Sequence, residues 1–341
     1  MQSEYFPTRY WHPLADGRVQ CDVCPRACTL REGQQGLCFV RMNHANEVVL
    51  TTYGRSTGFS VDPMEKKPLN HFQPGSSILS FGTAGCNLTC KFCQNWHMSK
   101  ARQMDRLMAR ASPAEIARVA KQQDCKSVAY TYNEPIIFLE YAMDTARACR
   151  ERGIFSVAVT AGYIRGAARQ AFFREMDAAN VDLKGFTAGF YKKLCSGRLQ
   201  PILDTLRYLK HETSVWFELT TLLIPDLNDS EREIDAMTSW VVENLGPDIP
   251  MHFTAFHPDY RMRHIPPTPV ATLRRAREIA LANGVRYAYT GNVHDPTGQS
   301  TYCHHCGARL IGRDRYAITD WRLTEDGCCA SCKTPCAGIW R

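Results

Sequence analysis

Three cysteines within eight residues give the strongest chemical signal in the sequence. Cys86, Cys90 and Cys93 have the spacing C-x3-C-x2-C inside TAGCNLTCKFCQNW, residues 83–96. Thiolates are soft ligands that select zinc, copper(I) or iron–sulfur clusters. A structural zinc site takes four protein ligands, whereas an open coordination position leaves room for a substrate. The three local thiols therefore predict an open metal or cluster site, with a zinc knuckle that borrows a distant fourth ligand as the alternative.

Two further cysteine groups lie nearer the ends of the chain. The first has the spacing C-x2-C-x3-C-x9-C and consists of Cys21, Cys24, Cys28 and Cys38. It predicts a closed site for zinc or an auxiliary cluster, or else a redox pair or free thiols. The second consists of two C-x2-C pairs, Cys303 with Cys306 and Cys329 with Cys332. These pairs predict a zinc ribbon or a rubredoxin-like iron site whose bound metal supplies folding energy.

Polar residues follow several short apolar runs in the middle of the chain. They are Glu134 in TYNEP, Thr160 in VTAGY, Asp182 and Lys184 in VDLK, and His257 in FHPDY. Asp182 and Lys184 lie two positions apart, so both would point to the same side of a strand. Each residue also has a purely structural interpretation. Glu134 would cap a helix that begins at Pro135, the Asp182–Lys184 pair would be a surface ion pair, and His257 a satisfied structural histidine.

The elements that must position these residues show a regular alternation of strands and helices. Predicted strands cover 78–82, 127–131, 155–160, 180–183, 215–223, 251–256 and 285–289. Predicted helices cover 113–123, 136–152, 201–211, 230–244 and 270–283. About six such units predict the α/β class and a partial (β/α)6 barrel of the TIM type. The three-cysteine loop directly follows the first of these strands, at the end where barrels carry function.

Composition shifts divide the chain into three predicted parts. Residues 1–75 form a cysteine-rich leader with a strand near 47–53 and a proline-containing connector, residues 76–299 the partial barrel, and residues 300–341 a small metal-binding ribbon with four cysteine ligands. The segment 300–341 is too short to bury a sufficient core without a metal.

Composition narrows the class of protein. The 341 residues are 44% hydrophobic and 22% charged, without an apolar run of the ~20 residues that span a bilayer. The start lacks a signal-peptide pattern, so we expect a cytoplasmic protein without a membrane partner. Its 16 cysteines then indicate metal chemistry rather than disulfides. We expect Cys125, Cys149 and Cys195 to be small buried hydrophobic residues. The net charge of +7 fits solvated helix faces, with a basic surface for an acidic partner as the alternative.

The segment GCNLTCKFCQN resembles the cluster loop of radical S-adenosylmethionine (radical SAM) enzymes, in particular of the pyruvate formate-lyase activating enzyme branch. The resemblance implies that Cys86, Cys90 and Cys93 hold a [4Fe–4S] cluster whose fourth iron is chelated by SAM. It places Phe92 near the adenine and Glu134, in the position of a GGEP motif, at the amino group of SAM. It also implies SAM contacts for Thr160, Asp182, Lys184 and His257, although Ala161 replaces the asparagine of the related TNGY stretch.

A more extensive resemblance covers nearly the whole chain. CDVCPRAC, DPMEKKPLNHFQPG, YTYNEP, VDLKGF and the terminal cysteine pairs are similar to the radical SAM member of the AmmeMemoRadiSam system, which implies AMMECR-type and Memo-type partner proteins. The implied reaction is reductive cleavage of SAM to a 5′-deoxyadenosyl radical that abstracts hydrogen from an unknown, macromolecular substrate. The electron would come from an external donor of the flavodoxin or ferredoxin type.

Two other functions remain open from the sequence. One is a glycyl-radical-enzyme activase, although such activators lack both the leader and the tail. The other is a zinc-rich module that binds nucleic acid or protein, because tail aromatics such as Tyr316 and Trp321 alternate with arginines such as Arg309 and Arg322.

Overall fold

The computed structural model describes residues 5–100 and 109–340. Contacts within the chain divide it into two compact units. Unit 1 consists of residues 1–62, 77–179 and 196–215, and unit 2 of residues 63–76, 180–195 and 216–341.

The central strands of unit 1 are parallel, as the alternating pattern predicts. Their order is β12 (Phe155–Thr160), β11 (Ser127–Tyr130), β9 (Ser77–Phe81) and β8 (Phe59–Pro63). Ser127 of β11 pairs with Ile78 on one side and Phe155 on the other. All four side chains of β11 are buried, which fits a strand covered on both faces.

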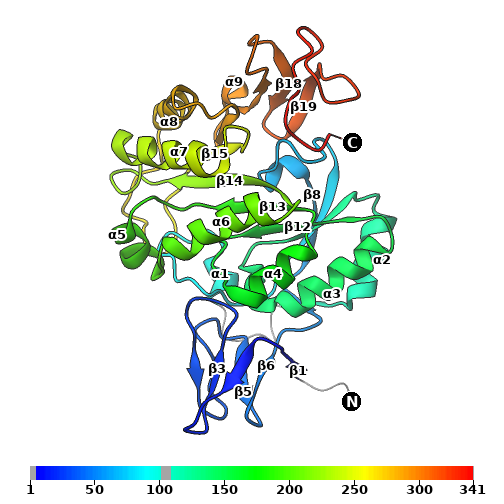
Figure 1. Ribbon diagram of the computed structural model, residues 1–341, viewed down its shortest axis with the longest axis vertical. Coiled ribbons are helices and arrows are strands. Elements are labelled where there is room, and N and C mark those ends of the chain that lie inside the picture. Colours follow the sequence, from blue (N-terminus) through cyan, green and yellow to red (C-terminus); the bar gives the residue numbers. More distant parts are fainter. Residues whose placement is uncertain (1–4, 101–108, 341) are drawn as a thin grey trace. The chain divides into compact units, whose positions relative to one another are not determined.

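Helices α2 (Pro113–Gln122), α3 (Leu139–Arg150), α4 (Gly166–Arg174) and α6 (Gln200–Glu212) complete the strand–helix units of unit 1, and α2 packs alongside α3 (Figure 1). The predicted start of α2 is confirmed. Ser112 and Glu115 form a reciprocal capping box, and Pro113 occupies the first turn. Helix α4 was not predicted, and its N-cap residue Arg165 makes no side-chain capping bond.

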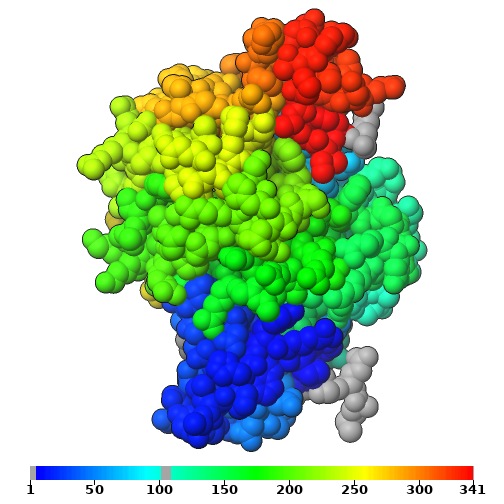
Figure 2. Space-filling view, in the orientation of Figure 1, coloured from blue at the N-terminus to red at the C-terminus, as the bar shows by residue number. Residues whose placement is uncertain are grey.

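The leader forms two small antiparallel sheets within unit 1. One has the order β1 (Phe6–Pro7), β6 (Glu47–Leu50) and β5 (Arg41–His44), and the other β2 (Trp11–Pro13), β3 (Val19–Cys21) and β4 (Thr29–Leu30). The leader is dark blue in Figure 2, and its Asp22 pairs with Arg165, the residue before α4, at 2.5 Å. Two-residue strands β7 (Arg55–Ser56) and β10 (Ala109–Arg110) pair with each other, and α1 (Trp96–Ser99) follows the three-cysteine loop.

Unit 2 contains the remaining strand–helix repeats. Its strand order is β16 (Ala288–Gly291), β15 (Met251–Ala255), β14 (Trp216–Leu223) and β13 (Ala178–Asp182), with β15 parallel to both neighbours. Helices α7 (Glu231–Leu245) and α8 (Val270–Ala282) lie side by side (Figure 1), and Gly284 follows α8 with a φ of +96°. Short helical turns α5 (Ala188–Phe190) and η4 (Tyr191–Cys195) follow β13.

The tail and the proline-containing connector, here residues 63–76, both belong to unit 2. After α9 (Pro296–Gln299), the tail forms an antiparallel sheet of β17 (Thr301–Tyr302), β18 (Arg309–Asp314) and β19 (Ala317–Trp321). The connector contains the turn η1 (Met64–Lys66). Its residue Phe72 forms an isolated parallel β-bridge with Ile339, near the end of the chain. No helix in the described residues is long and apolar enough to cross a membrane. The first four residues, part of the predicted leader, lie outside that description.

Candidate active site of unit 1 and the metal site of the tail

The three-cysteine loop begins directly after β9 and is largely buried. The Cys86 thiol accepts a bond from the Leu88 backbone N–H at 3.4 Å, and the Cys93 thiol lies 3.2 Å from the Ser99 hydroxyl. Cys90 is 8% exposed. Burial, together with the nearby Glu134 carboxylate, raises the pKa of Cys86 to about 12. This thiol is therefore neutral at pH 7 unless a bound metal takes the place of its proton.

The backbone at the start of this loop is held by Asn133, a residue that was not singled out from the sequence. Its Oδ1 accepts from the Thr83 N–H and its Nδ2 donates to the Gly85 carbonyl, each at 2.9 Å. Gly85 has a φ of +87°, and a side chain there would lie 2.0 Å from the Cys38 carbonyl oxygen. Tyr132 adopts a φ of +68°, the conformation that a glycine would supply most easily.

Glu134 connects the ends of β11 and β12. Its carboxylate accepts from the Thr160 hydroxyl at 2.5 Å and from the Ala161 backbone N–H at 2.8 Å. It also accepts from the Ile136 N–H at 3.3 Å and so caps the turn η3 (Pro135–Phe138). The structural interpretation of Glu134 as a helix cap is therefore correct, and the same carboxylate also lies close enough to Cys86 to perturb its pKa.

The other predicted SAM residues belong to different surroundings. Phe92 lies on the loop itself and is 4% exposed. Asp182 and Lys184 belong to unit 2, where the Lys184 ammonium pairs with the Asp182 carboxylate at 2.6 Å. His257 follows β15 and is exposed. Within unit 1 the structure thus brings the cysteine loop together with Glu134 and Thr160, while Asp182, Lys184 and His257 lie in the other unit.

Comparisons with known proteins identify the family. A model of the radical SAM superfamily matches residues 81–237. A Methanocaldococcus jannaschii protein, named uncharacterized protein MJ0808, is 40% identical over 304 residues, which cover 89% of this chain and 90% of that protein. The chain belongs to the radical SAM superfamily. Pyruvate formate-lyase-activating enzyme of Clostridium pasteurianum is 24% identical over 167 residues, which cover 47% of this chain and 67% of that enzyme.

The fold of this radical SAM protein also has a solved counterpart. The crystal structure of a radical SAM methyltransferase from Sphaerobacter thermophilus matches 84% of this chain and 76% of its own, with a TM-score of 0.52 and 14% identity. At that identity the similarity concerns the fold alone. The predicted α/β partial barrel and the four-cysteine tail are therefore confirmed, and the leader, predicted with one strand, contains two small sheets.

Membership in the radical SAM superfamily implies a [4Fe–4S] cluster and SAM, and the residues of unit 1 fit both. Cys86, Cys90 and Cys93 offer three thiols on one loop, one fewer than a fully ligated cluster uses. The Glu134 carboxylate beside Cys86 suits the ammonium of a bound SAM. Lys100, which donates to the Leu88 carbonyl at 2.9 Å, adds a positive charge that lowers the pKa of Cys86, although burial dominates that pKa.

The tail of the radical SAM protein carries a second type of cysteine site. The thiols of Cys303, Cys306, Cys329 and Cys332 all lie within 4.8 Å of one another. The separation is 3.6 Å between Cys303 and Cys332, and 3.7 Å between Cys306 and Cys329. A metal–sulfur bond of about 2.3 Å in tetrahedral geometry places neighbouring sulfurs roughly 3.8 Å apart. This quartet could therefore hold a single zinc or iron ion.

Neighbouring candidates in the tail stay outside the quartet. The Cys328 thiol faces the Asp326 carboxylate at 3.4 Å, and Cys336 is buried. The His304 ring bonds the Tyr287 hydroxyl at 3.1 Å, and His305 is exposed.

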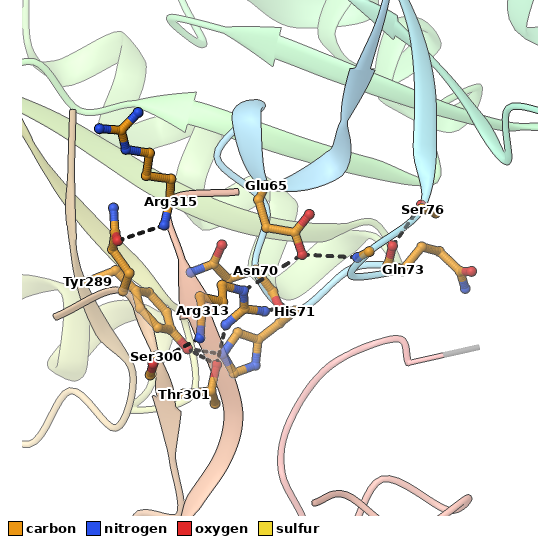
Figure 3. Close-up of polar contacts among 12 residues, drawn as sticks. Glu65, Asn70, His71, Gln73, Ser76, Tyr289, Ser300, Thr301, Arg313 and Arg315 are labelled. Atoms are coloured by element: carbon orange, nitrogen blue, oxygen red, sulfur yellow. Dashed lines mark hydrogen bonds and ion pairs between the residues drawn. The ribbon is translucent and has the colours of Figure 1, made fainter. Parts of the chain in front are cut away.

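A buried polar network joins the connector of unit 2 to the tail (Figure 3). Arg313, 2% exposed, donates to the Thr301 hydroxyl and to the Asn70 carbonyl, each at 2.8 Å. Its Nε lies 3.6 Å from the Glu65 carboxylate. This buried arginine therefore attaches β18 to the connector by both charge and hydrogen bonds.

The network continues through His71 towards the strands of unit 2. The His71 ring contacts the Ala337 carbonyl at 2.6 Å and the Tyr289 hydroxyl at 2.5 Å, while its backbone N–H donates to Glu218 at 2.7 Å. Glu218 also bonds His252 at 2.7 Å. Burial lowers the pKa of His71 to about 4, so the ring is neutral at pH 7, with Nδ1–H donating to Ala337 and Nε2 accepting from Tyr289.

Proposed function

We propose that this radical SAM protein abstracts a hydrogen atom from a macromolecular or partner-borne substrate. The observation that carries the proposal is the three-cysteine loop with the Glu134 carboxylate close to Cys86. Cys86, Cys90 and Cys93 would hold the cluster, which together with SAM would supply one-electron reductive cleavage of a carbon–sulfur bond, giving methionine and a 5′-deoxyadenosyl radical for hydrogen abstraction. The electron comes from an external donor of the flavodoxin or ferredoxin type.

The residues of this chain contribute binding and orientation. Thr160 and the Ala161 N–H hold the Glu134 carboxylate in place for the amino group of SAM, and such charge-assisted bonds contribute about 1.5–3 kcal/mol. Asn133 fixes the root of the cluster loop. Phe92, which directly precedes Cys93 and is 4% exposed, is proposed to lie near the adenine of SAM. The Asp182–Lys184 pair and His257 are proposed to contact SAM as well.

The finer assignment rests on the motifs along the chain. Within our proposal the protein is the radical SAM member of an AmmeMemoRadiSam system and acts with an AMMECR-type and a Memo-type partner in the cytoplasm. The relative from M. jannaschii supports a shared organisation, because the match extends over 304 residues, 89% of this chain, which is more than the predicted barrel of residues 76–299 alone.

The second candidate function is the activation of a glycyl-radical enzyme, favoured by the similarity to pyruvate formate-lyase-activating enzyme. That match covers 47% of this chain, so it leaves more than half of the chain without a counterpart. Nucleic-acid binding by the tail has weaker support, because Arg313 is buried and Arg309 and Arg322 both pair with Asp320.

The first experiment measures SAM cleavage. Anaerobically reconstituted protein with SAM and dithionite should form 5′-deoxyadenosine, and Cys90→Ala should abolish its formation. Cys125→Ala is the matched control, because Cys125 is also buried and lies outside all three cysteine groups. Full activity of Cys90→Ala would refute the site assignment.

The second experiment looks for the substrate. The reduced enzyme is incubated with SAM and each candidate partner labelled with deuterium. Transfer of deuterium into 5′-deoxyadenosine from an AMMECR-type or Memo-type protein supports the finer proposal. Transfer from a glycine backbone position of a glycyl-radical enzyme would support activase function instead.

A further inference from the structure

The four cysteines of the leader converge on one cavity inside unit 1. Cys21 ends β3, Cys24 and Cys28 lie in the turn before β4, and Cys38 lies in the loop before β5. All four line the same cavity, which Gly36, Arg41 and Asn87 also border. Cys21, Cys24 and Cys38 are buried and Cys28 is partly exposed, and all four are free of disulfides. A segment of 18 residues thus directs four thiols at a single enclosed space.

The spacing of these thiols differs from that of the tail quartet. Among the described residues, the tail quartet is the one group in which three or more ligand atoms of cysteine, histidine or carboxylate residues lie within 4.8 Å of one another. No three of the leader thiols meet that limit, although they share one cavity. A single tetrahedral ion needs sulfurs roughly 3.8 Å apart. The leader quartet is therefore too open for one ion.

The three-cysteine loop of unit 1 provides a reference for thiols spaced this widely. The thiols of Cys86, Cys90 and Cys93 also fall outside the 4.8 Å group. Their loop belongs to a superfamily that binds a [4Fe–4S] cluster there. A cluster separates its ligands by several irons, whereas a single ion draws all sulfurs around one centre. In spacing, the leader quartet resembles the cluster loop and not the tail.

The surroundings of the leader thiols suit a negatively charged group. The backbone N–H two residues after the cysteine donates to the thiol of Cys21, of Cys24 and of Cys38. Four thiolates around a four-iron core leave a net negative charge, and hydrogen bonds to the sulfurs stabilise such clusters. The Arg41 guanidinium, 2% exposed, lies near Cys21 and Cys38 and contributes positive charge there, which it shares with the Glu140 carboxylate.

We propose that Cys21, Cys24, Cys28 and Cys38 ligate a second [4Fe–4S] cluster, complete in its protein ligands, whereas the tail holds one metal ion. The site adjoins the loop of the first cluster. Arg26, on the cavity wall, donates to the Asn87 carbonyl at 2.9 Å, and the Cys38 carbonyl leaves no room for a side chain at Gly85. Filling the leader cavity therefore steadies the backbone between Gly85 and Asn87, which carries Cys86.

The proposal is tested without altering the leader. The variant Cys86→Ala/Cys90→Ala/Cys93→Ala/Cys306→Ser/Cys329→Ser retains the leader quartet as its one complete cysteine group. After anaerobic reconstitution with iron and sulfide it should contain about four irons and four acid-labile sulfides per chain, and show an electron paramagnetic resonance signal when reduced. Less than about one sulfide per chain, or one zinc without sulfide, would overturn the proposal.

The unmodified protein supplies a second measurement in case this variant folds poorly. Two clusters give about eight sulfides per chain and a single cluster about four, and a mononuclear tail adds none. Cys306→Ser/Cys329→Ser alone should lose the tail metal and retain all the sulfide. A count of four sulfides in the unmodified chain would contradict a leader cluster, and this readout does not depend on SAM cleavage.

Discussion

Replacing Arg41 by alanine should destabilise unit 1 strongly, because the Arg41 guanidinium joins the leader to the barrel through an ion pair and hydrogen bonds. Arg41 begins β5, and its Nη atoms contact the two Glu140 carboxylate oxygens of α3 at 3.2 and 2.5 Å. Its Nε donates to the Ile137 carbonyl at 2.9 Å. The Arg41 and Glu140 side chains are 2% and 7% exposed. The pair is therefore shielded from water and from salt.

The magnitude follows from what the substitution leaves behind. Arg41→Ala leaves the Glu140 carboxylate buried without its counter-charge, and breaking a buried pair on one side costs about 3–5 kcal/mol. For a unit of this size we expect the melting temperature to fall by about 6–20 °C. Removing both charges, as in Arg41→Met/Glu140→Leu, should restore most of the loss, because no unpaired charge remains.

Anaerobic thermal unfolding followed by circular dichroism measures the effect, with the iron content determined in parallel because Arg41 also borders the leader cavity. Arg18→Ala is the matched control. Arg18 pairs with Asp16 in the same leader, but the two side chains are 41% and 52% exposed, so no resolvable shift is expected.

A melting temperature of Arg41→Ala within about 1–2 °C of the parent would refute a buried, unpaired Glu140 charge. A double variant with the same melting temperature and iron content as Arg41→Ala would refute it as well. The loss would then come from packing and not from an unpaired charge.

Two more perturbations test other parts of the chain. The pKa of His71 is about 4 in the folded protein, against about 6.5 when unfolded, so the unfolded chain binds the extra proton between these values. Stability should therefore decline as the pH falls from about 6.5 to about 4, by up to roughly 3 kcal/mol from this residue. The difference between parent and His71→Asn in urea unfolding at pH 7 and pH 5 measures it, and identical pH slopes would refute it. Gly85→Ala should lower the iron content and destabilise the fold by at least about 1 kcal/mol, because its φ is +87° and the new Cβ meets the Cys38 carbonyl. Gly189→Ala, where a Cβ meets no atom within 4 Å, is its control, and equal iron content in both variants would exclude the predicted contact.

Signals encoded locally were predictable from the sequence. The capping residues Ser112 and Glu115 define the start of α2, and the β-branched run at 155–160 gives β12 with the predicted bounds. The strand before Gly291 was placed too early, because Val285 and Tyr287 are buried without belonging to β16. The helix α4 was missed because its first turn lacks a capping side chain.

Contacts between distant positions were not predictable in the same way. Arg41 and Glu140 are 99 positions apart, and neither carries a local sign of the other. Asn133 supports the cluster loop 50 positions upstream, although its place beside Glu134 could have marked it as part of the site. The spacing of cysteines suggested ligands in all three groups, but only the three-dimensional structure distinguishes the compact tail quartet from the open leader quartet.

The backbone of Ile339, near the end of the chain, is hydrogen-bonded to the connector, and this affects which truncations of the protein are informative. Gln73 donates its backbone N–H to the Ile339 carbonyl, and Ile339 donates to the His71 carbonyl, each at 2.7 Å. Truncating the chain before Ala337 would remove the carbonyl that accepts from the His71 ring, which also contacts Tyr289. Point substitutions at the metal ligands, and not truncation, are therefore the cleaner way to separate the role of the ribbon from that of the barrel.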